Sequence, residues 1–385
     1  MSIRIVGAGG AGIQVLDEWI LLSDRQQGSV ACDGEACAVE GSLASEKLLL
    51  APDLAGGLGC FGSRDLAWRM VGQENRRLDA LLKDCSGLLI VIGLAGATGA
   101  TVAEALSLKA VEREIPTTVF AFPPFPFEPA QRRESAEATR AALPAEVSLF
   151  LFPPPAFFED PLPGVAAVRR GLREFHGALA QWIGVWEGVA NGAVRPILRG
   201  GGAEDSPFAR GGRIDGCRLF GVAAAHLDFA SPGLLDGAEF REAAEKADRC
   251  LAYVEGGDGL SGSCGELGRK LQEQLAQGTD LWLLQRTEEA PAENRLLLLV
   301  GRAASRHHRV SECPEEGRGK PEEPAAPARA APEPEGVAAF PALEATPFAK
   351  TAATMYKGVN LDIPAFRRRR GSRFAKERPA EPGEA

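Results

Sequence analysis

The stretch "IRIVGAGGAGIQVLDEWILL", residues 3–22, joins an apolar run, a glycine-rich turn and a helical pattern without a gap. Its first residues predict a buried strand, and the residues after the turn predict a helix. Glycines let the backbone approach a phosphate, and the free N–H groups at the start of the helix point at the anion. The order strand, glycine turn, helix therefore predicts nucleotide binding at residues 6–12.

Two kinds of nucleotide site fit this turn. The pattern G-x-G-x-x-G at Gly7, Gly9 and Gly12, with Asp33 placed to bind a ribose, fits an NAD-dependent Rossmann oxidoreductase. That alternative does not explain two further glycine-rich turns, "GGLGCFG" at 56–62 and "GLAGATGAT" at 93–101. Several loops at the carboxyl ends of neighbouring strands would instead surround a polyphosphate on several sides.

Short apolar runs alternate with stretches long enough for a helix, which predicts an α/β fold with a parallel sheet covered on both faces. The runs are "IRIVGA", "SGLLIVIGLAG", "TTVFAF" and "VSLFLF". Later segments predict one long helix and then a smaller α+β domain. The predicted organisation is a nucleotide-binding domain at 1–164, a central helix at 165–198, a catalytic-type loop region at 199–215, a second domain at 216–304, a disordered Pro/Ala/Glu linker at 305–354, a partner-binding peptide at 355–372 and a basic end at 373–385.

Composition excludes several classes of protein. With 385 residues, 45% of them apolar, the chain can bury the cores of two domains, and it has no apolar run long enough to span a membrane. The beginning "MSIRIVGAGG" lacks an export signal, which predicts a cytoplasmic protein. Eight scattered cysteines without C-x-x-C spacing predict reduced thiols and no metal site. A net charge of -9 argues against nucleic acid as the partner of the folded part.

The glycine turns resemble the phosphate loops of the FtsZ family of bacterial cell-division proteins, the prokaryotic branch of the tubulin superfamily. "GAGGAGIQ" is similar to the family's first loop, GVGGGGNN, and "AGATGAT" at 95–101 is similar to its signature GGGTGTG. The match keeps Gly96, Thr98 and Gly99. "PPFPFEPAQR" at 123–132 resembles the family's RPFTFEGRKR.

The resemblance implies a tubulin-like two-domain fold that binds GTP or GDP, with Mg²⁺ as a further candidate. The residues that it places at the nucleotide are Gly9, Gly10, Ala11, Gly12, Ile13, Gly59, Gly96, Ala97, Thr98, Gly99, Glu128, Arg132 and Gly177. On the central helix, "LREFHGALAQ" resembles FREADNVLRQ, so His176 and Gly177 replace the family's base-reading acid and amide, respectively. His176 alone is interpreted as a residue of the helix surface and not as a catalyst.

The family's catalytic loop, N-L-D-F-A-D, polarises the water that attacks GTP in the neighbouring subunit. Spacing aligns it with residues 203–212, where Glu204 and Asp205 are the candidate acids although neither is in register. A rival alignment uses "HLDFAS" at 226–231 and keeps Asp228. Because the acids are altered, we expect slow or absent hydrolysis, and a non-hydrolysing scaffold or regulator of the same fold stays open.

The tail stretch "GVNLDIPAFRRRR", residues 358–370, matches the family's terminal LDIPAF peptide letter for letter. The resemblance implies that it binds membrane tethers or division regulators, so contact with the membrane would be indirect. The implied partner-binding residues are Leu361, Asp362, Ile363, Pro364, Phe366 and Arg367. The whole chain is thus interpreted as a cytoplasmic protein of the division site that polymerises head to tail.

Overall fold

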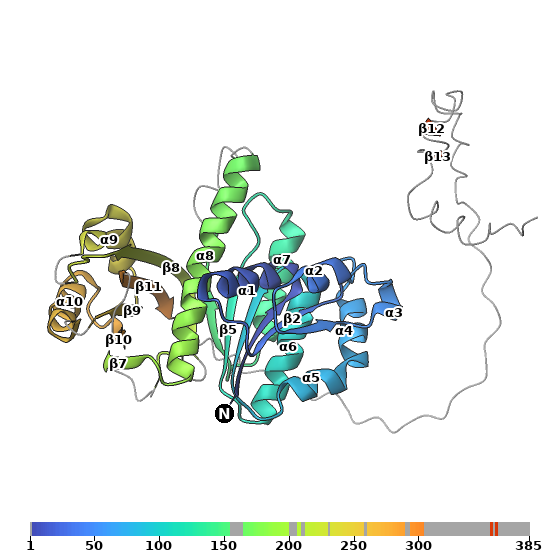
Figure 1. The fold of residues 1–385 in the computed structure, drawn as a ribbon, viewed down its shortest axis with the longest axis horizontal. Helices are drawn as coiled ribbons and strands as arrows, with labels where there is room; N and C mark the ends of the chain where they lie inside the picture. The colour runs from blue at the N-terminus through green and yellow to red at the C-terminus, as the bar shows by residue number, and fades with distance from the viewer. Residues whose placement is uncertain are drawn as a thin grey trace, which may run out of the picture. The chain divides into compact units, whose positions relative to one another are not determined.

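The structure is a computed structural model. It describes residues 2–154, 165–199, 206–208, 212–229, 232–257, 260–288 and 293–303, together with 355–356 and 359–360. The last two pairs belong to a separate unit, where β12 (Met355–Tyr356) pairs antiparallel with β13 (Val359–Asn360). The predicted linker at 305–354 and the LDIPAF peptide at 361–366 lie outside the described residues. Everything below concerns the first unit (Figure 1).

The amino-terminal half is a parallel sheet of six strands in the spatial order β3-β2-β1-β4-β5-β6. The strands are β1 (Ser2–Ala8), β2 (Ser29–Asp33), β3 (Glu46–Leu49), β4 (Cys85–Gly93), β5 (Thr117–Phe122) and β6 (Ser148–Leu151). The four predicted apolar runs are confirmed as β1, β4, β5 and β6. The sequence analysis missed β2 and β3, which are short.

Helices cover both faces of this sheet. They are α1 (Gly9–Ser23), α2 (Ala36–Gly41), α3 (Pro52–Ala55), α4 (Arg64–Gln73), α5 (Asn75–Leu81), α6 (Ala97–Glu112) and α7 (Ala130–Ala142). Alternate strand residues face opposite sides. Ile5 thus packs with α1, whereas Val6 packs with α4, α5 and α6. The strands are buried on both faces, as the predicted α/β class requires.

The long helix α8 (Val165–Ala190) packs beside α1 and connects the two halves of the unit (Figure 1). The predicted helical end at residue 198 is wrong, because the helix ends at Ala190 and residues Arg195–Leu198 form β7. Gly192 has a φ of 78°, a left-handed conformation that ends helices. Pro196 follows and lacks the N–H that a continuing helix would need.

The second half continues the sheet in the order β8-β11-β9-β10-β7. Its elements are β8 (Arg213–Ala224), η2 (Gly233–Asp236), α9 (Ala238–Glu245), β9 (Arg249–Gly256), α10 (Leu260–Gln274), β10 (Asp280–Thr287) and β11 (Asn294–Ala303). The apolar residues of α9 and α10 pack on one face of these strands, and those of α8 pack on the other. The predicted α+β half is thereby confirmed.

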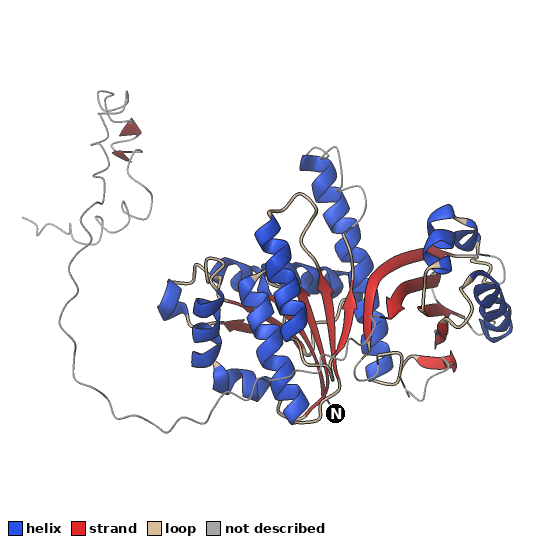
Figure 2. Ribbon diagram, turned by 180° about the vertical axis from the view of Figure 1, so that it is seen from behind, coloured by secondary structure: helices blue, strands red, loops and turns tan. Residues whose placement is uncertain are grey.

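Strand β8 joins the two halves into one eleven-stranded sheet. It runs parallel to β6, where Leu149 and Phe150 pair with Arg213 and Ile214, and the Leu149 N–H donates to the Gly212 carbonyl at 2.8 Å. It pairs antiparallel with β11 on its other side. Figure 2 shows the red strands continuing on both sides of the long helix. Since β8 begins at Arg213, the predicted loop region 199–215 ends three residues earlier than expected.

Candidate phosphate-binding cavity

A cavity of about 270 Å³ opens at the edge of the sheet where β1, β4 and β5 end, called here the carboxyl edge. Three loops from widely separated parts of the chain form it. Its lining residues are Ala8, Gly9, Gly10, Ala11, Gly93, Ala95, Gly96, Gly99, Phe122, Pro123, Pro124, Phe125, Glu128 and Arg132. Ligand sites of open parallel sheets lie at this edge, so the cavity is the leading candidate for the functional site.

Glycines bring the first two loops into direct contact. A Cβ added to Gly99 would lie 2.6 Å from the Ala8 carbonyl oxygen, and one added to Gly9 would lie 3.1 Å from Gly99. A Cβ on Gly12 would lie 2.1 Å from the Val91 carbonyl oxygen. Gly9 also has a φ of 73°, which disfavours any other residue. These glycines therefore serve the close approach of backbone segments that shape the cavity.

Two helices begin at the cavity with free backbone donors. Helix α1 follows Ala8 and helix α6 follows Gly96, and neither N-terminus is capped by a side-chain hydrogen bond. The first N–H groups of a helix have no partner within the helix, and the dipole adds partial positive charge there. The walls between them are glycine and alanine, so the donors are sterically accessible. The arrangement is suited to an anion such as a phosphate chain.

The loop between α3 and α4 lies next to the cavity without lining it. Cys60 Sγ and Thr98 Oγ1 are 3.1 Å apart, which ties this loop to the first turn of α6. Gly59 has a φ of 80°, and its N–H donates to the Gly34 carbonyl at 3.0 Å. Phe61 has a φ of 53° and remains 72% exposed. Gly59 and Thr98 thus support the cavity from behind.

The polar wall of the cavity comes from the loop after β5. Glu128 and Arg132 form an ion pair, and Glu128 Oε1 accepts a hydrogen bond from the Phe125 N–H at 2.9 Å. This hydrogen bond closes the turn Phe125–Glu128. The Arg132 guanidinium lies at the rim, half exposed, where it can reach an anionic ligand. Both residues are among those that the family resemblance places at the nucleotide.

Asp33 is a buried acid close to the two helix N-termini. Its Oδ1 accepts a hydrogen bond from the Gly34 N–H at 2.7 Å, and its Oδ2 lies near Gly10. Burial raises the pKa of this carboxyl, although hydrogen bonds from Gly34 and Thr98 oppose the rise. Among the described residues no cluster of three or more metal-ligating side chains exists.

His176 and Gly177 lie on α8, behind the aromatic end of the cavity. The His176 ring centre is 6.4 Å from that of Phe122 and 6.2 Å from that of Phe175. Burial lowers the pKa of His176 to about 4, so the imidazole is neutral at pH 7. His176 is partly buried and its ring packs beside two aromatic rings, so it is less exposed than the expected position on the helix surface. No atom lies within 4 Å of a Cβ added at Gly177, which leaves space beside it.

Of the candidate catalytic acids, only Asp228 lies within the described residues, and it does not line the cavity. Glu204 and Asp205 lie outside the described residues, but Phe208 just after them is buried between Phe120 and Phe150. Its carbonyl accepts a hydrogen bond from Ser148 Oγ at 3.2 Å, at the amino end of β6. Asp228 is exposed in the loop after β8. Since β8 is parallel to β6, that loop follows the carboxyl end, and the two candidate loops leave opposite edges of the sheet.

Several residues that line the cavity could not be predicted as binding residues from their amino-acid type. Ala8, Gly93 and Ala95 flank the predicted glycine turns, and position alone identifies them. Phe122, Pro123, Pro124 and Phe125 are apolar and carry no binding signal apart from their place after β5. Ile13 and Gly12, which were predicted to touch the nucleotide, are buried behind the loop, where Ile13 packs in the core. No described helix is long and apolar enough to cross a membrane.

The half of the chain that contains the cavity is similar to a known protein family. The model of the "Tubulin/FtsZ family, GTPase domain" matches residues 2–153, which include all three cavity loops. The cell division protein FtsZ of Methanothermobacter thermautotrophicus is 28% identical over 136 residues, 35% of this chain and 36% of that protein. That of Buchnera aphidicola is 24% identical over 197 residues, 51% of this chain and 50% of that protein. The chain thus spans about a third to a half of the length of these relatives.

Solved structures extend the likeness beyond the first half. An empty FtsZ dimer from M. jannaschii has a TM-score of 0.62 at 19% identity and covers 78% of this chain and 88% of that one. A GTPγS-bound protofilament of CetZ2 from Haloferax volcanii has a TM-score of 0.57 at 17% identity, covering 79% and 94%. At these identities the likeness concerns the fold, and it includes the second half.

Proposed function

This chain is a member of the Tubulin/FtsZ family, and we propose from that premise that it binds guanine nucleotide and polymerises head to tail as an FtsZ-like cytoskeletal protein of cell division. The observation that carries the proposal is the pair of uncapped helix N-termini, α1 and α6, facing one glycine-lined cavity. The family's GTPase domain covers that cavity. FtsZ and CetZ structures are both similar in fold, so the division role rests on the sequence resemblance.

Within the cavity, the backbone N–H groups of Gly9 to Gly12 and Gly96 to Gly99 would hold the phosphates, and Arg132 would add a charge at the rim. Phe122 and His176 would meet the base. Mg²⁺, if bound with the nucleotide, would take phosphate oxygens as ligands. These assignments rest on the lining of the cavity and on the family resemblance.

A nucleotide panel tests the proposal. Thermal unfolding would be followed with GTP, GDP, ATP and NADH at equal concentrations, because a ligand stabilises the state that binds it. We expect stabilisation by GTP and GDP. Stabilisation by NADH alone would restore the oxidoreductase alternative. Thr98→Leu places a bulkier side chain against Cys60 in the first turn of α6 and should weaken binding by about tenfold or more.

Polymerisation would give the segment before β8 a role at the neighbouring subunit. Phe208, three residues after Asp205, is held at the amino end of β6, the edge opposite to the cavity. Head-to-tail stacking brings opposite edges of successive subunits together, so it would present this segment to the neighbour's phosphates. Asp228 leaves the carboxyl edge and would not be presented in that way. The geometry thus supports Glu204 and Asp205 over Asp228, with a non-hydrolysing scaffold as the outcome if neither acts.

The LDIPAF peptide would attach the filament to membrane tethers or regulators. Phe366 and Ile363 would be its buried anchors, Pro364 would limit the conformations lost on binding, and many copies along a filament would add avidity. Truncation after Thr354 should leave assembly intact and abolish localisation at the division site, as seen by fluorescence microscopy. Phe366→Ala should reproduce most of that loss. A truncated chain that localises normally would remove this role from the peptide.

A further inference from the structure

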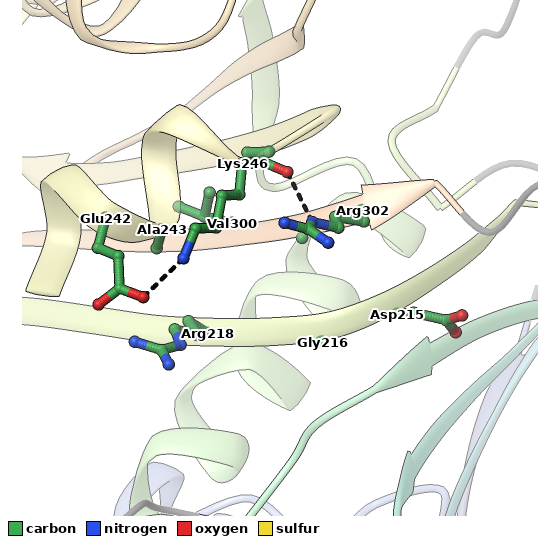
Figure 3. Close-up of a pocket in the computed structure, with 10 residues that line it drawn as sticks. Asp215, Gly216, Arg218, Glu242, Ala243, Lys246, Val300 and Arg302 are labelled. Atoms are coloured by element: carbon green, nitrogen blue, oxygen red, sulfur yellow. Dashed lines mark hydrogen bonds and ion pairs between the residues drawn. The ribbon is translucent and has the colours of Figure 1, made fainter.

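A second cavity, of about 350 Å³, lies in the other half of the unit, between β8, α9 and β11. Its lining comprises Asp215, Gly216, Arg218, Glu242, Ala243, Lys246, Ala247, Val300, Gly301 and Arg302. None of these residues belongs to the loops of the phosphate-binding cavity. Figure 3 shows Arg218, Lys246 and Arg302 on three different segments, with Arg302 beside the Lys246 carbonyl and Arg218 on the other side of Lys246, towards Glu242.

A break in strand pairing creates this cavity. Val300 of β11 pairs with Arg218, but two residues later Arg302 pairs with Asp215, so β8 carries one extra residue here. Gly216 within this bulge has a φ of 62°, and no atom lies within 4 Å of a Cβ added to it. Bulges bend a strand and redirect its side chains. The bulge separates Arg218 from Asp215, whose carboxylate turns to Arg140 at 2.5 Å.

The two acids of the lining are already paired, while two of the cations have free donors. Asp215 is neutralised by Arg140, and Glu242 by Lys246 at 2.8 Å. Arg302 Nε donates to the Lys246 carbonyl at 2.9 Å, but its terminal nitrogens have no partner among the described residues. Arg218 likewise forms no hydrogen bond within the described part of the chain. Together with Lys246, its charge lowers the pKa of Glu242.

We propose that this cavity binds the phosphate group of a small phosphate monoester. Arg218 and Arg302 offer planar guanidinium donors, and Lys246 offers a point charge from a third side. A tetrahedral dianion with three terminal oxygens can accept hydrogen bonds from cations on more than one side. A carboxylate, with two coplanar oxygens and a single charge, can satisfy fewer of them. The volume is sufficient for a small phosphorylated metabolite.

Glu242 has a defined place in this proposal. Glu242 forms an ion pair with Lys246, and its negative charge opposes an incoming anion. Replacing it with glutamine removes that charge while keeping the shape of the side chain. Glu242→Gln should therefore bind phosphate more tightly than the unaltered chain, by about three- to tenfold. A gain of affinity cannot arise from a damaged fold.

The test is isothermal titration calorimetry of the full chain with glycerol 3-phosphate, in the presence of excess GDP so that the other cavity is occupied. We expect a dissociation constant of about 0.1 to 1 mM. Arg218→Gln and Arg302→Gln should each weaken binding by about tenfold or more. Arg241→Gln is the matched control, since Arg241 lies on α9, pairs with Asp236 and does not line the cavity.

Three results would overturn the proposal: no heat of binding, equal binding by the Arg218→Gln and Arg302→Gln chains, or weaker binding by Glu242→Gln. Succinate serves as a dicarboxylate of similar size, and binding of succinate as tightly as glycerol 3-phosphate would also reject a phosphate site. The result is independent of the proposed GTP binding. A chain that fails to bind GDP can still show phosphate binding that depends on Arg218.

Discussion

Gly99 illustrates how single residues decide the cavity. Its α-carbon lies so close to the first loop that a methyl group would overlap the Ala8 carbonyl oxygen at 2.6 Å. Gly96, three residues earlier, has room, since its nearest neighbour would be the Gly93 carbonyl oxygen at 3.6 Å. Both residues line the cavity, yet only one of them needs to be glycine for steric reasons. This difference provides a matched pair of variants.

Gly99→Ala should force the two phosphate loops apart and weaken nucleotide binding by about tenfold or more, equivalent to at least about 1.4 kcal/mol. Gly96→Ala should stay within about threefold of the unaltered chain, because its added methyl meets only ordinary contacts. Displacement of a fluorescent GDP analogue measures both. Equal losses for the two variants would show that space between the loops does not control binding.

His176 should make stability depend on pH. Its pKa is about 4 in the folded chain against 6.5 for the free side chain, so the unfolded chain takes up the proton first. The contribution of the neutral imidazole is complete above pH 6.5 and is lost as the pH falls towards 4. At pH 5 the loss should be about 2 kcal/mol relative to pH 7.

The measurement is urea unfolding at pH 7 and pH 5, comparing the unaltered chain with His176→Gln. The variant should show a smaller loss of stability on acidification, while His226→Gln, at an exposed position after β8, serves as the control. An identical pH dependence in all three chains would mean that the ring is not buried as a neutral group.

At the scale of elements, one hydrogen bond connects α8 to the sheet. Trp186 Nε1 donates to Thr118 Oγ1 of β5 at 3.0 Å, and both side chains are buried. Trp186→Phe keeps most of the apolar volume but leaves the Thr118 hydroxyl without its donor. An unsatisfied buried polar group costs about 1 to 3 kcal/mol.

Thr118→Val in the Trp186→Phe chain should recover much of that loss, since both polar partners are then absent. The double-mutant cycle, followed by circular dichroism in urea, should give a coupling energy of about 1 kcal/mol. Additive effects of the two substitutions would mean that the bond contributes nothing to the attachment of α8.

Elements with strong local signals could be predicted from the sequence, and contacts between distant residues could not. The runs that became β1, β4, β5 and β6 are apolar and bounded by turns, so their type and edge were predictable. The end of α8 was also encoded, in Gly192 and Pro196, but apolar periodicity outweighed those signals. By contrast, the contact of Cys60 with Thr98 and the bulge at Gly216 depend on tertiary packing that no local pattern reports.

The same distinction holds for the candidate site. Gly9, Gly99, Glu128 and Arg132 were predicted from glycine turns and family resemblance, and the fold brings them to one cavity. The burial of His176 was missed because a helix pattern with one histidine does not reveal which neighbours cover it. The aromatic wall at Phe122 was missed because its role follows only from where β5 ends.

At the scale of the whole molecule, the two edges of the sheet predict how hydrolysis would be organised. Residual GTP turnover should be slow, and Glu204→Ala with Asp205→Ala should reduce it by about 100-fold, as expected for a positioned catalytic group. Asp228→Ala should leave turnover unchanged. Phosphate release above the assembly threshold measures all three chains.

Mixing two variant chains distinguishes GTP hydrolysis within one subunit from hydrolysis by acids of the neighbouring subunit. A Gly99→Ala chain keeps the candidate acids but has an impaired nucleotide cavity. The Glu204→Ala, Asp205→Ala chain keeps the nucleotide cavity but lacks the candidate acids. If the loop acts on the neighbour, a mixture should release more phosphate than the sum of the two chains alone. Turnover abolished by Asp228→Ala would favour the rival alignment and contradict the edge argument.

The pairing of β8 with β6 gives the unit a mechanical property. Strands β1, β4, β5, β6 and β8 all run from one edge to the other, and the proposed subunit contacts lie at those edges. Tension along a filament would therefore act parallel to the strands. Hydrogen bonds between neighbouring strands would be loaded together, in shear, and would not open one at a time. A stretched filament should accordingly part at its contacts between subunits before any subunit unravels.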